Sequence, residues 1–123
     1  MREVYSAVYV VNYKEREQIP VDLAGSKDVL MRWLVGRRTG AKTYAMRHFE
    51  IKPGGIIPLH SHPEEHEIFV LDGEAKLLGD AEDFVAKKDD VVFVPPNLPH
   101  GYDNTEGTKS FRFICVIPLL NKE

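Results

Sequence analysis

The sequence contains few of the features that mark whole classes of protein. Cys115 is the only cysteine among 123 residues, so an internal disulfide is excluded and stability has to come from packing. No stretch approaches the about 18 consecutive apolar residues of a membrane-spanning helix, and the first residues lack the apolar core of a signal peptide. We therefore predict a cytoplasmic protein with no membrane partner.

Neither sign of charge predominates in the chain. The chain has 16 basic and 19 acidic residues, a net charge of -3, and its lysines and arginines are scattered along the sequence. Nucleic-acid-binding domains carry a basic patch or stripe, and none is visible here, so no nucleic-acid partner is expected. With 43% apolar and 28% charged residues, the composition is typical of one compact domain, which we predict to span residues 1–123.

The chain is divided into short apolar stretches separated by turns, with no sustained helical period. Such a series, at spacings of about 8 to 12 residues, predicts an all-β antiparallel sandwich or barrel. The segments 29–35 and 91–94 are apolar at nearly every position and are expected to be covered on both faces. The expected strands are 4–11, 29–35, 43–52, 56–62, 67–72, 74–78, 84–86, 91–94 and 111–117.

Three of the five histidines lie within residues 60–66, at His60, His62 and His66. Side chains two apart on a strand share a face, so His60 and His62 are expected side by side, and the bend that Pro63 favours could bring His66 over the same point. Neutral imidazoles are common ligands of divalent transition metals. A solvated histidine-bearing loop is the alternative, but three converging histidines would repel one another when protonated. We therefore predict a metal site.

A zinc-protease helix is a rival interpretation, because His62 and His66 have its i, i+4 spacing. It fails in detail, since Pro63 stands where that motif has its catalytic glutamate and His60 would face away on a helix.

A fourth ligand is expected among the remaining histidines, His48 and His100. His100 follows the segment 95–99, whose three prolines stiffen a bend and could present one imidazole rigidly. His48 lies inside an expected strand, and we predict a structural role for it.

The spacing around the histidine cluster resembles the first conserved motif of the cupin superfamily. Gly54 is followed after five residues by His60 and His62, after three more by His66, and after six more by Gly73. His66 stands at the position that usually holds glutamate. The motif covers residues 54–73.

A looser second motif covers residues 89–104. Pro95, His100 and Asn104 stand at the expected positions, whereas Asp89 and Asn97 replace the usual glycines. The chain looks especially similar to small single-domain bacterial and archaeal cupins whose metal is held by four histidines.

The resemblance implies a double-stranded β-helix, or jelly roll, with one divalent ion bound inside the barrel by His60, His62, His66 and His100. The ion could be Mn, Fe, Ni, Cu, Co or Zn. Glu67 is an alternative to its neighbour His66 as a metal ligand, because a four-residue spacer after His62 would make Glu67 the ligand. The six-residue interval before Gly73 favours His66, and adjacent strand residues face opposite ways, so we expect one of the pair to reach the metal.

Strand alternation predicts a pocket beside the metal. Arg47 shares the more apolar face of its strand and could hold a substrate carboxylate or a developing anion, a catalytic role; a surface ion pair is the alternative. Cys115 is interpreted as a small buried apolar residue rather than a reactive thiol. The expected apolar walls are Phe49, Phe113, Cys115 and Ile117.

Three functions remain open. The first is a small-molecule oxidoreductase, dioxygenase-like in mechanism, although the resemblance also includes isomerases and decarboxylases. The second is a metal-dependent module that binds or senses a small molecule without turnover, and the third is a domain that the metal merely stabilises. The segments 4–11 and 29–35 carry more apolar surface than one small barrel covers, so we also predict a homodimer.

Overall fold

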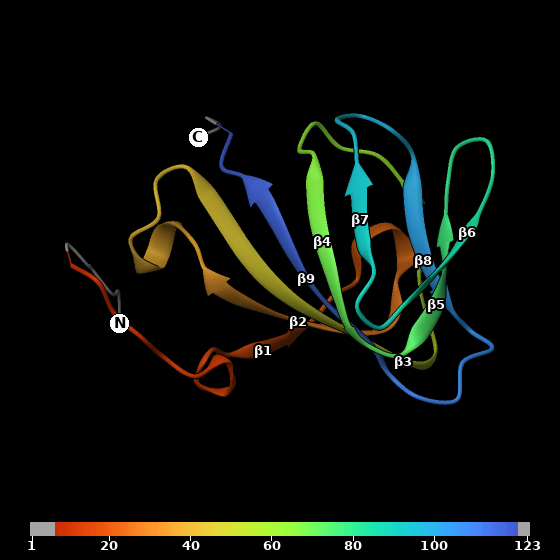
Figure 1. Ribbon diagram of the computed structural model, residues 1–123, viewed down its shortest axis with the longest axis horizontal. Coiled ribbons are helices and arrows are strands. Elements are labelled where there is room, and N and C mark those ends of the chain that lie inside the picture. The colour runs from red at the N-terminus through yellow and green to blue at the C-terminus, as the bar shows by residue number, and fades with distance from the viewer. Residues whose placement is uncertain (1–6, 121–123) are drawn as a thin grey trace.

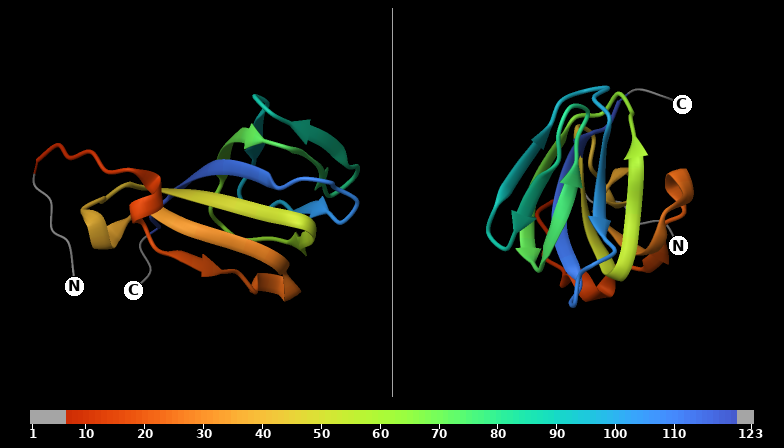
Figure 2. Two further views of the ribbon diagram at one scale, coloured as in Figure 1. Left: turned by 90° about the horizontal axis from the view of Figure 1, so that it is seen from below. Right: turned by 90° about the vertical axis from the view of Figure 1, so that its right-hand side faces the viewer.

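The computed structural model describes residues 7–120 as one antiparallel sheet that curls into a nearly closed barrel (Figures 1 and 2). Its hydrogen-bonded order is β6-β5-β8-β3-β9-β4-β7, with β2 pairing β3 and β1 pairing β2. The predicted all-β antiparallel fold is confirmed. The strands are β1 Gln18–Pro20, β2 Lys27–Val35, β3 Tyr44–His60, β4 His66–Asp72, β5 Glu74–Leu78, β6 Phe84–Lys87, β7 Val91–Val94, β8 His100–Asn104 and β9 Phe111–Pro118.

The part of the chain that the structure describes also has three 3-10 turns, one before β1, one between β1 and β2, and one between β2 and β3. They are η1 Tyr13–Glu15, η2 Leu23–Gly25 and η3 Arg37–Thr39. No helix within the described range 7–120 is long and apolar enough to cross a membrane.

The long strand β3 joins the two halves of the barrel. Its first part pairs with β9, from Tyr44 opposite Pro118 to Ile51 opposite Phe111, and its last part pairs with β8. The strand bends between these parts, where Gly54 has a φ of +88°, a conformation that side-chain-bearing residues rarely adopt. Two strands were expected here, 43–52 and 56–62. The structure has one bent strand that ends at His60.

Strand β8 approaches β3 closely because Gly101 has no side chain. A Cβ atom at Gly101 would lie 2.6 Å from the carbonyl oxygen of Ile57, well inside van der Waals contact. This strand was not expected from the sequence, because glycine, aspartate and asparagine are uncommon in strands. Pairing with β3 and β5 overrides that local preference.

The core is formed by inward-facing residues of β3, β4, β8 and β9. Phe113 is 1% exposed, and its ring centroid lies 5.0 Å from those of Phe49 and Tyr102 in stacked arrangements. Asn104, also 1% exposed, donates from Nδ2 to the carbonyl oxygens of Ile51, Lys52 and Lys109. These contacts hold β8 and β9 against β3 behind the histidines.

The strand expected at 4–11 is wrong for the residues that the structure describes. Residues 7–12 form no strand, and Val8 and Val10 are 97% and 92% exposed. Residues 4–6 lie outside the described part of the chain. Valine and tyrosine favour a strand only where another strand supplies hydrogen bonds and a packing surface.

The two segments expected to be buried on both faces alternate instead. On β2 Val29 and Met31 are 2% and 8% exposed whereas Leu30 between them is only partly buried, and on β7 Val91 and Phe93 are 76% and 60% exposed beside buried Val94. One face of the curved sheet covers the core and the other faces outward, so a continuous apolar run did not imply burial on both sides.

Candidate metal centre

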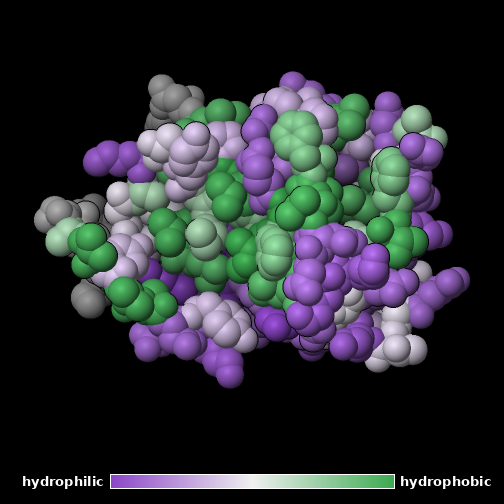
Figure 3. Space-filling view, in the orientation of Figure 1, coloured by the Kyte–Doolittle hydropathy of each residue, from purple (hydrophilic) through white to green (hydrophobic). Residues whose placement is uncertain are grey.

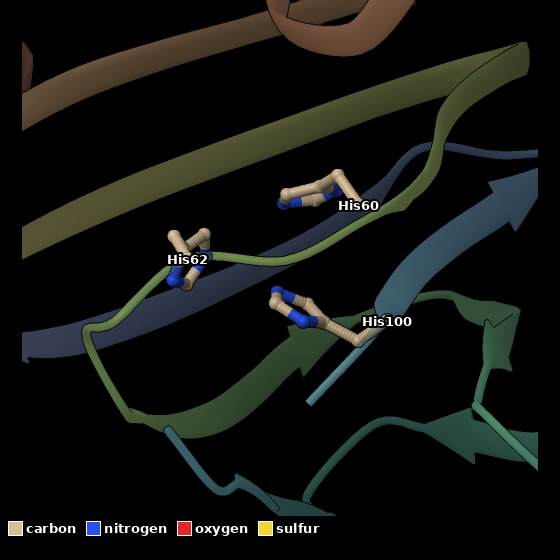
Figure 4. A group of neighbouring side chains, drawn as sticks. All are labelled: His60, His62 and His100. Atoms are coloured by element: carbon tan, nitrogen blue, oxygen red, sulfur yellow. The ribbon is translucent and has the colours of Figure 1, made fainter. Parts of the chain in front are cut away.

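Three histidines meet at one end of the barrel. His60 ends β3 and His100 begins β8, and the two are direct cross-strand partners. His62 follows two residues after β3 ends, in irregular chain rather than on the expected strand. One ring nitrogen of each residue lies within 4.8 Å of the others, and Figure 4 shows the three rings gathered around one space.

Backbone carbonyl groups set the tautomers of two of these rings. His60 Nδ1 lies 2.8 Å from the oxygen of Pro58, and His100 Nδ1 lies 2.9 Å from the oxygen of Leu98. A carbonyl oxygen only accepts, so each Nδ1 carries the proton and each Nε2 keeps a free lone pair. Metal-ligating histidines are oriented in this way in proteins.

The donor set fits a divalent transition metal. His100 is 3% exposed, and its buried Nε2 has no hydrogen-bond partner among the residues described. A buried acceptor without a donor is costly, and a cation shared with His60 and His62 would remove that cost. Three nitrogens spread evenly around one ion at about 2.1 Å lie about 3.4 to 3.6 Å apart, so the three rings would have to move closer together on binding.

His66 lies beside this group but is held by other residues. It begins β4, is 6% exposed, and its ring centroid is 4.5 Å from that of His62. Its Nε2 lies 3.5 Å from Nη2 of Arg47, and its Nδ1 lies 3.4 Å from the hydroxyl of Tyr102. Arginine only donates, so Nε2 accepts and Nδ1 donates to the Tyr102 oxygen.

The four-histidine site therefore stays a prediction, because the structure groups three ligand atoms and places His66 next to them. The neighbouring Glu67 is exposed on the opposite side of β4, where a hydrogen bond with Glu65 raises its pKa to about 6.

Burial keeps these histidines neutral. Burial, followed by the charge of Arg47, lowers the pKa of His66 to about 2, and burial lowers the pKa of His100 to about 4. The pKa of His62 is also lowered, first by burial and then by His60. Neutral imidazole is the form that ligates a metal, so the site is ready to bind one at neutral pH.

Arg47 places a positive charge beside the histidines. Its guanidinium lies 4.9 Å from the ring centroid of Phe49 and 5.6 Å from that of Trp33, and its Nη2 donates to Cys115 Sγ at 3.3 Å. It forms no ion pair with a carboxylate in the described part of the chain, so the surface ion pair considered above is not formed there. The cation remains available to an anionic ligand.

A cavity of about 210 Å³ opens beside the histidines. Of the pocket residues predicted from the sequence, Arg47, Phe49 and Phe113 line it, whereas Cys115 and Ile117 lie in the hydrophobic core and do not. The full lining is Val21, Leu23, Met31, Arg47, Phe49, Ile57, His60, His62, His66, Tyr102 and Phe113.

Comparison with known families identifies the fold. The sequence matches the cupin domain over residues 47–117, more than half of the chain. The chain belongs to the cupin family. This cupin is 28% identical to the polyketide cyclase RemF of Streptomyces resistomycificus, with a TM-score of 0.86 over 93% of this chain and 81% of that one. The match confirms the predicted jelly-roll barrel.

Two other relatives come from Thermotoga maritima. A protein described as a predicted oxalate decarboxylase is 29% identical, with a TM-score of 0.77 over 91% of this chain and all of that one. An oxalate-binding protein is 32% identical over 80 residues, 64% of this chain and 65% of that protein. An uncharacterised protein of Methanocaldococcus jannaschii is 34% identical over 58 residues, 46% of each chain. The chain spans less than two thirds of the length of the oxalate-binding protein and of the Methanocaldococcus jannaschii protein.

Sequence reasoning missed five residues that line the cavity of this cupin, which are Val21, Leu23, Met31, Ile57 and Tyr102. Tyr102 stands two positions after His100 on β8, so strand alternation could have placed it on the same face. Val21 and Leu23 belong to the connection between β1 and β2. No local pattern marks them, because only the folding of that hairpin over the barrel brings them to the cavity.

His48 lies apart from the metal centre, in a polar contact. It is 3% exposed, and Arg112 Nη1 donates to its Nε2 at 3.0 Å. Burial, followed by the charges of Arg112 and Arg32, lowers its pKa below 6.5. These contacts agree with the predicted structural role.

Replacing His48 with glutamine should reduce the acid sensitivity of this cupin. His48 takes up a proton near pH 6.5 in the unfolded chain but only at lower pH in the folded protein. Acidification through that interval therefore lowers the free energy of unfolding by at most about 1.4 kcal/mol per pH unit. Glutamine still accepts from Arg112 but does not titrate. Urea unfolding between about pH 7.5 and pH 5 should therefore show a smaller loss of unfolding free energy for His48→Gln. An equal loss in both proteins would contradict the assignment.

Proposed function

We propose that this cupin binds a divalent transition metal through His60, His62 and His100, with His66 as fourth ligand once its Nε2 is released from Arg47, and that the ion and Arg47 together bind a small anionic molecule. The buried Nε2 of His100, which lies near two other histidines and has no hydrogen-bond partner in the described part of the chain, is the observation that carries the proposal. The identity of the ion is left open among Mn, Fe, Ni, Cu, Co and Zn.

The charge of the site supports an anionic ligand. Neutral imidazoles leave the charge of a bound ion uncompensated, and Arg47 adds another positive charge that has no carboxylate partner among residues 7–120. A ligand with two adjacent oxygens could chelate the ion while one oxygen meets the guanidinium. The names of two relatives contain oxalate, a small dianion with such oxygens, which agrees with this chemistry.

As an enzyme, this cupin would be a dioxygenase-like oxidoreductase. A bound ion would stabilise a carboxylate or enolate oxygen and, if redox-active, pass electrons to dioxygen. Arg47 would orient the substrate carboxylate, and the apolar walls would exclude water. Arg47 is therefore the proposed catalytic residue, with Phe49 and Phe113 as walls.

A binding or sensing module without turnover is the second candidate. Tyr102 lines the cavity, but burial raises its pKa, so it stays protonated and does not serve as a base at neutral pH. The histidines would be occupied by the metal. This shortage of a side-chain base favours binding without turnover unless the ion itself drives the chemistry.

Metal analysis and titration test both forms. Untagged protein purified without added metal should contain about one ion per chain, and oxalate should bind the metal-loaded protein but not the chelated one. Absence of metal, or oxalate binding that survives chelation, would overturn the proposal. Oxygen consumption in the presence of bound small carboxylates would favour the enzyme, and binding without consumption would favour the module.

The predicted homodimer and cytoplasmic location remain proposals. Figure 3 shows apolar side chains gathered on the face over β9, β4 and β7. The exposed large apolar residues of β4 and β7 are Phe69, Val91 and Phe93. An exposed apolar surface of this kind supports association with a second copy.

A further inference from the structure

Most of the cavity wall is apolar. The polar residues, which are the histidines, Arg47 and Tyr102, are outnumbered by the side chains of Val21, Leu23, Met31, Phe49, Ile57 and Phe113. Oxalate is polar over its whole surface, so it would lose water against these walls and gain no hydrogen bond from them. An apolar wall around a few convergent polar groups is typical of a site for a ligand with an apolar part.

The size of the cavity limits that ligand. A volume of about 210 Å³ equals roughly seven water molecules at about 30 Å³ each. Covalently bonded atoms lie closer together than waters, so a ligand of roughly seven to ten non-hydrogen atoms would fill it. Oxalate would leave part of the wall uncovered, and a multi-ring polyketide would not fit.

We propose that the ligand of this cupin is a small amphipathic carboxylate, and that Val21 and Leu23 select its apolar part. The proposal rests on the metal site proposed above. The carboxylate and an adjacent oxygen would face the ion and Arg47, and a short aliphatic chain would lie against Val21, Leu23 and Phe49. In chemical terms the ligand resembles oxalate with one carboxylate replaced by an acyl group that carries an alkyl chain.

Val21 and Leu23 belong to the connection between β1 and β2. They lie outside the matched region 47–117. Backbone hydrogen bonds hold the segment in place, from Val21 N to Val29 O at 2.9 Å and from Ser26 N to Leu23 O at 2.9 Å, and Ser26 Oγ donates to the same Leu23 oxygen at 2.6 Å. The connection is therefore ordered enough to present fixed side chains to a ligand.

Leu23 sits at the cavity mouth. It lines the cavity yet is 51% exposed, so one side of it faces a bound ligand and the other faces solvent. Replacing a half-exposed side chain of this kind changes stability little. Substitutions at Leu23 therefore report on ligand selection rather than on folding.

Titration of the metal-loaded full chain tests the proposal. The probes are oxalate, pyruvate, 2-oxobutanoate and 4-methyl-2-oxopentanoate. Each is titrated by calorimetry into protein loaded with the same ion. Each buried methylene should tighten binding about three- to fourfold, so the branched acid should bind at least about 20-fold more tightly than pyruvate. Leu23→Ser should reduce this ratio at least about fivefold, with little change for pyruvate itself.

A second variant and a control make the test specific. Leu23→Phe should narrow the cavity and weaken binding of the branched acid while pyruvate binding is retained. Val91→Ser is the control, because Val91 is 76% exposed on β7 and does not line the cavity. The ratio of 4-methyl-2-oxopentanoate affinity to pyruvate affinity should be the same in the Val91→Ser protein as in the unaltered protein.

The outcomes separate this inference from the proposed function. If oxalate or pyruvate binds as tightly as the branched acid, or if neither Leu23 variant changes the ratio, the apolar-ligand inference is overturned and the metal-anion site stands. If none of the acids binds the metal-loaded protein, both proposals are overturned.

Discussion

The His100→Gln protein should contain almost no bound metal. His100 supplies the buried Nε2 whose lone pair has no partner among residues 7–120, and its orientation is set by the carbonyl oxygen of Leu98. Glutamine offers only a weakly ligating amide oxygen in place of the imidazole. We expect the apparent metal affinity to fall by at least about 100-fold, measured by elemental analysis and by competition with a chelator.

The control for this substitution is His48→Gln. His48 contacts Arg112 rather than the metal centre, so its loss should leave metal content unchanged. Full metal content in the His100→Gln protein would contradict the metal site.

His66→Gln separately tests the fourth ligand. We expect the apparent metal affinity to fall by about 10- to 100-fold, and an unchanged affinity would leave three protein ligands.

Arg47→Gln should bind oxalate about 10- to 100-fold more weakly while keeping its metal. A hydrogen bond to a charged group contributes about 1.5 to 3 kcal/mol, and the guanidinium has no carboxylate partner within the described chain that would take its place. Removing a cation next to the metal should not lower metal affinity and should raise it slightly, because like charges repel. Calorimetry with oxalate and a chelator competition measure the two effects.

Matched variants identify the role of the guanidinium. Arg47→Lys keeps the charge but loses the planar pair of donors, so it should restore part of the affinity. Arg37→Gln, on η3 and away from the cavity lining, should have no effect. Equal oxalate affinity in the Arg47→Gln protein would show that the anion is held by the metal alone.

The sequence was sufficient to predict the class of fold and the centre of the site. Alternating apolar residues and frequent turns are local features, and they predicted the strands at 74–78 and 111–117 closely. The spacing of His60 and His62 and the proline-rich bend before His100 predicted a shared site, although His62 lies in irregular chain after β3 and not on the expected strand. The placement of Phe49 and Phe113 on one wall followed from the same alternation.

Other features depended on contacts between distant parts of the chain. Residues 7–12 have the composition of a strand but find no neighbouring strand, whereas β8 has an unfavourable composition and pairs on both sides. Pairing energy depends on what lies alongside, which composition does not record.

The sequence by itself determined that this protein would be a small β-barrel with His60, His62 and His66 close together, because residues a few positions apart along the chain cannot lie far apart. Only the tertiary structure decided that Arg47 would reach His66 Nε2, that Tyr102 would hold its Nδ1, and that the hairpin bearing Leu23 would form the cavity mouth. Those contacts join segments far apart in sequence, and they arise only when the curled sheet brings its strands and connections together.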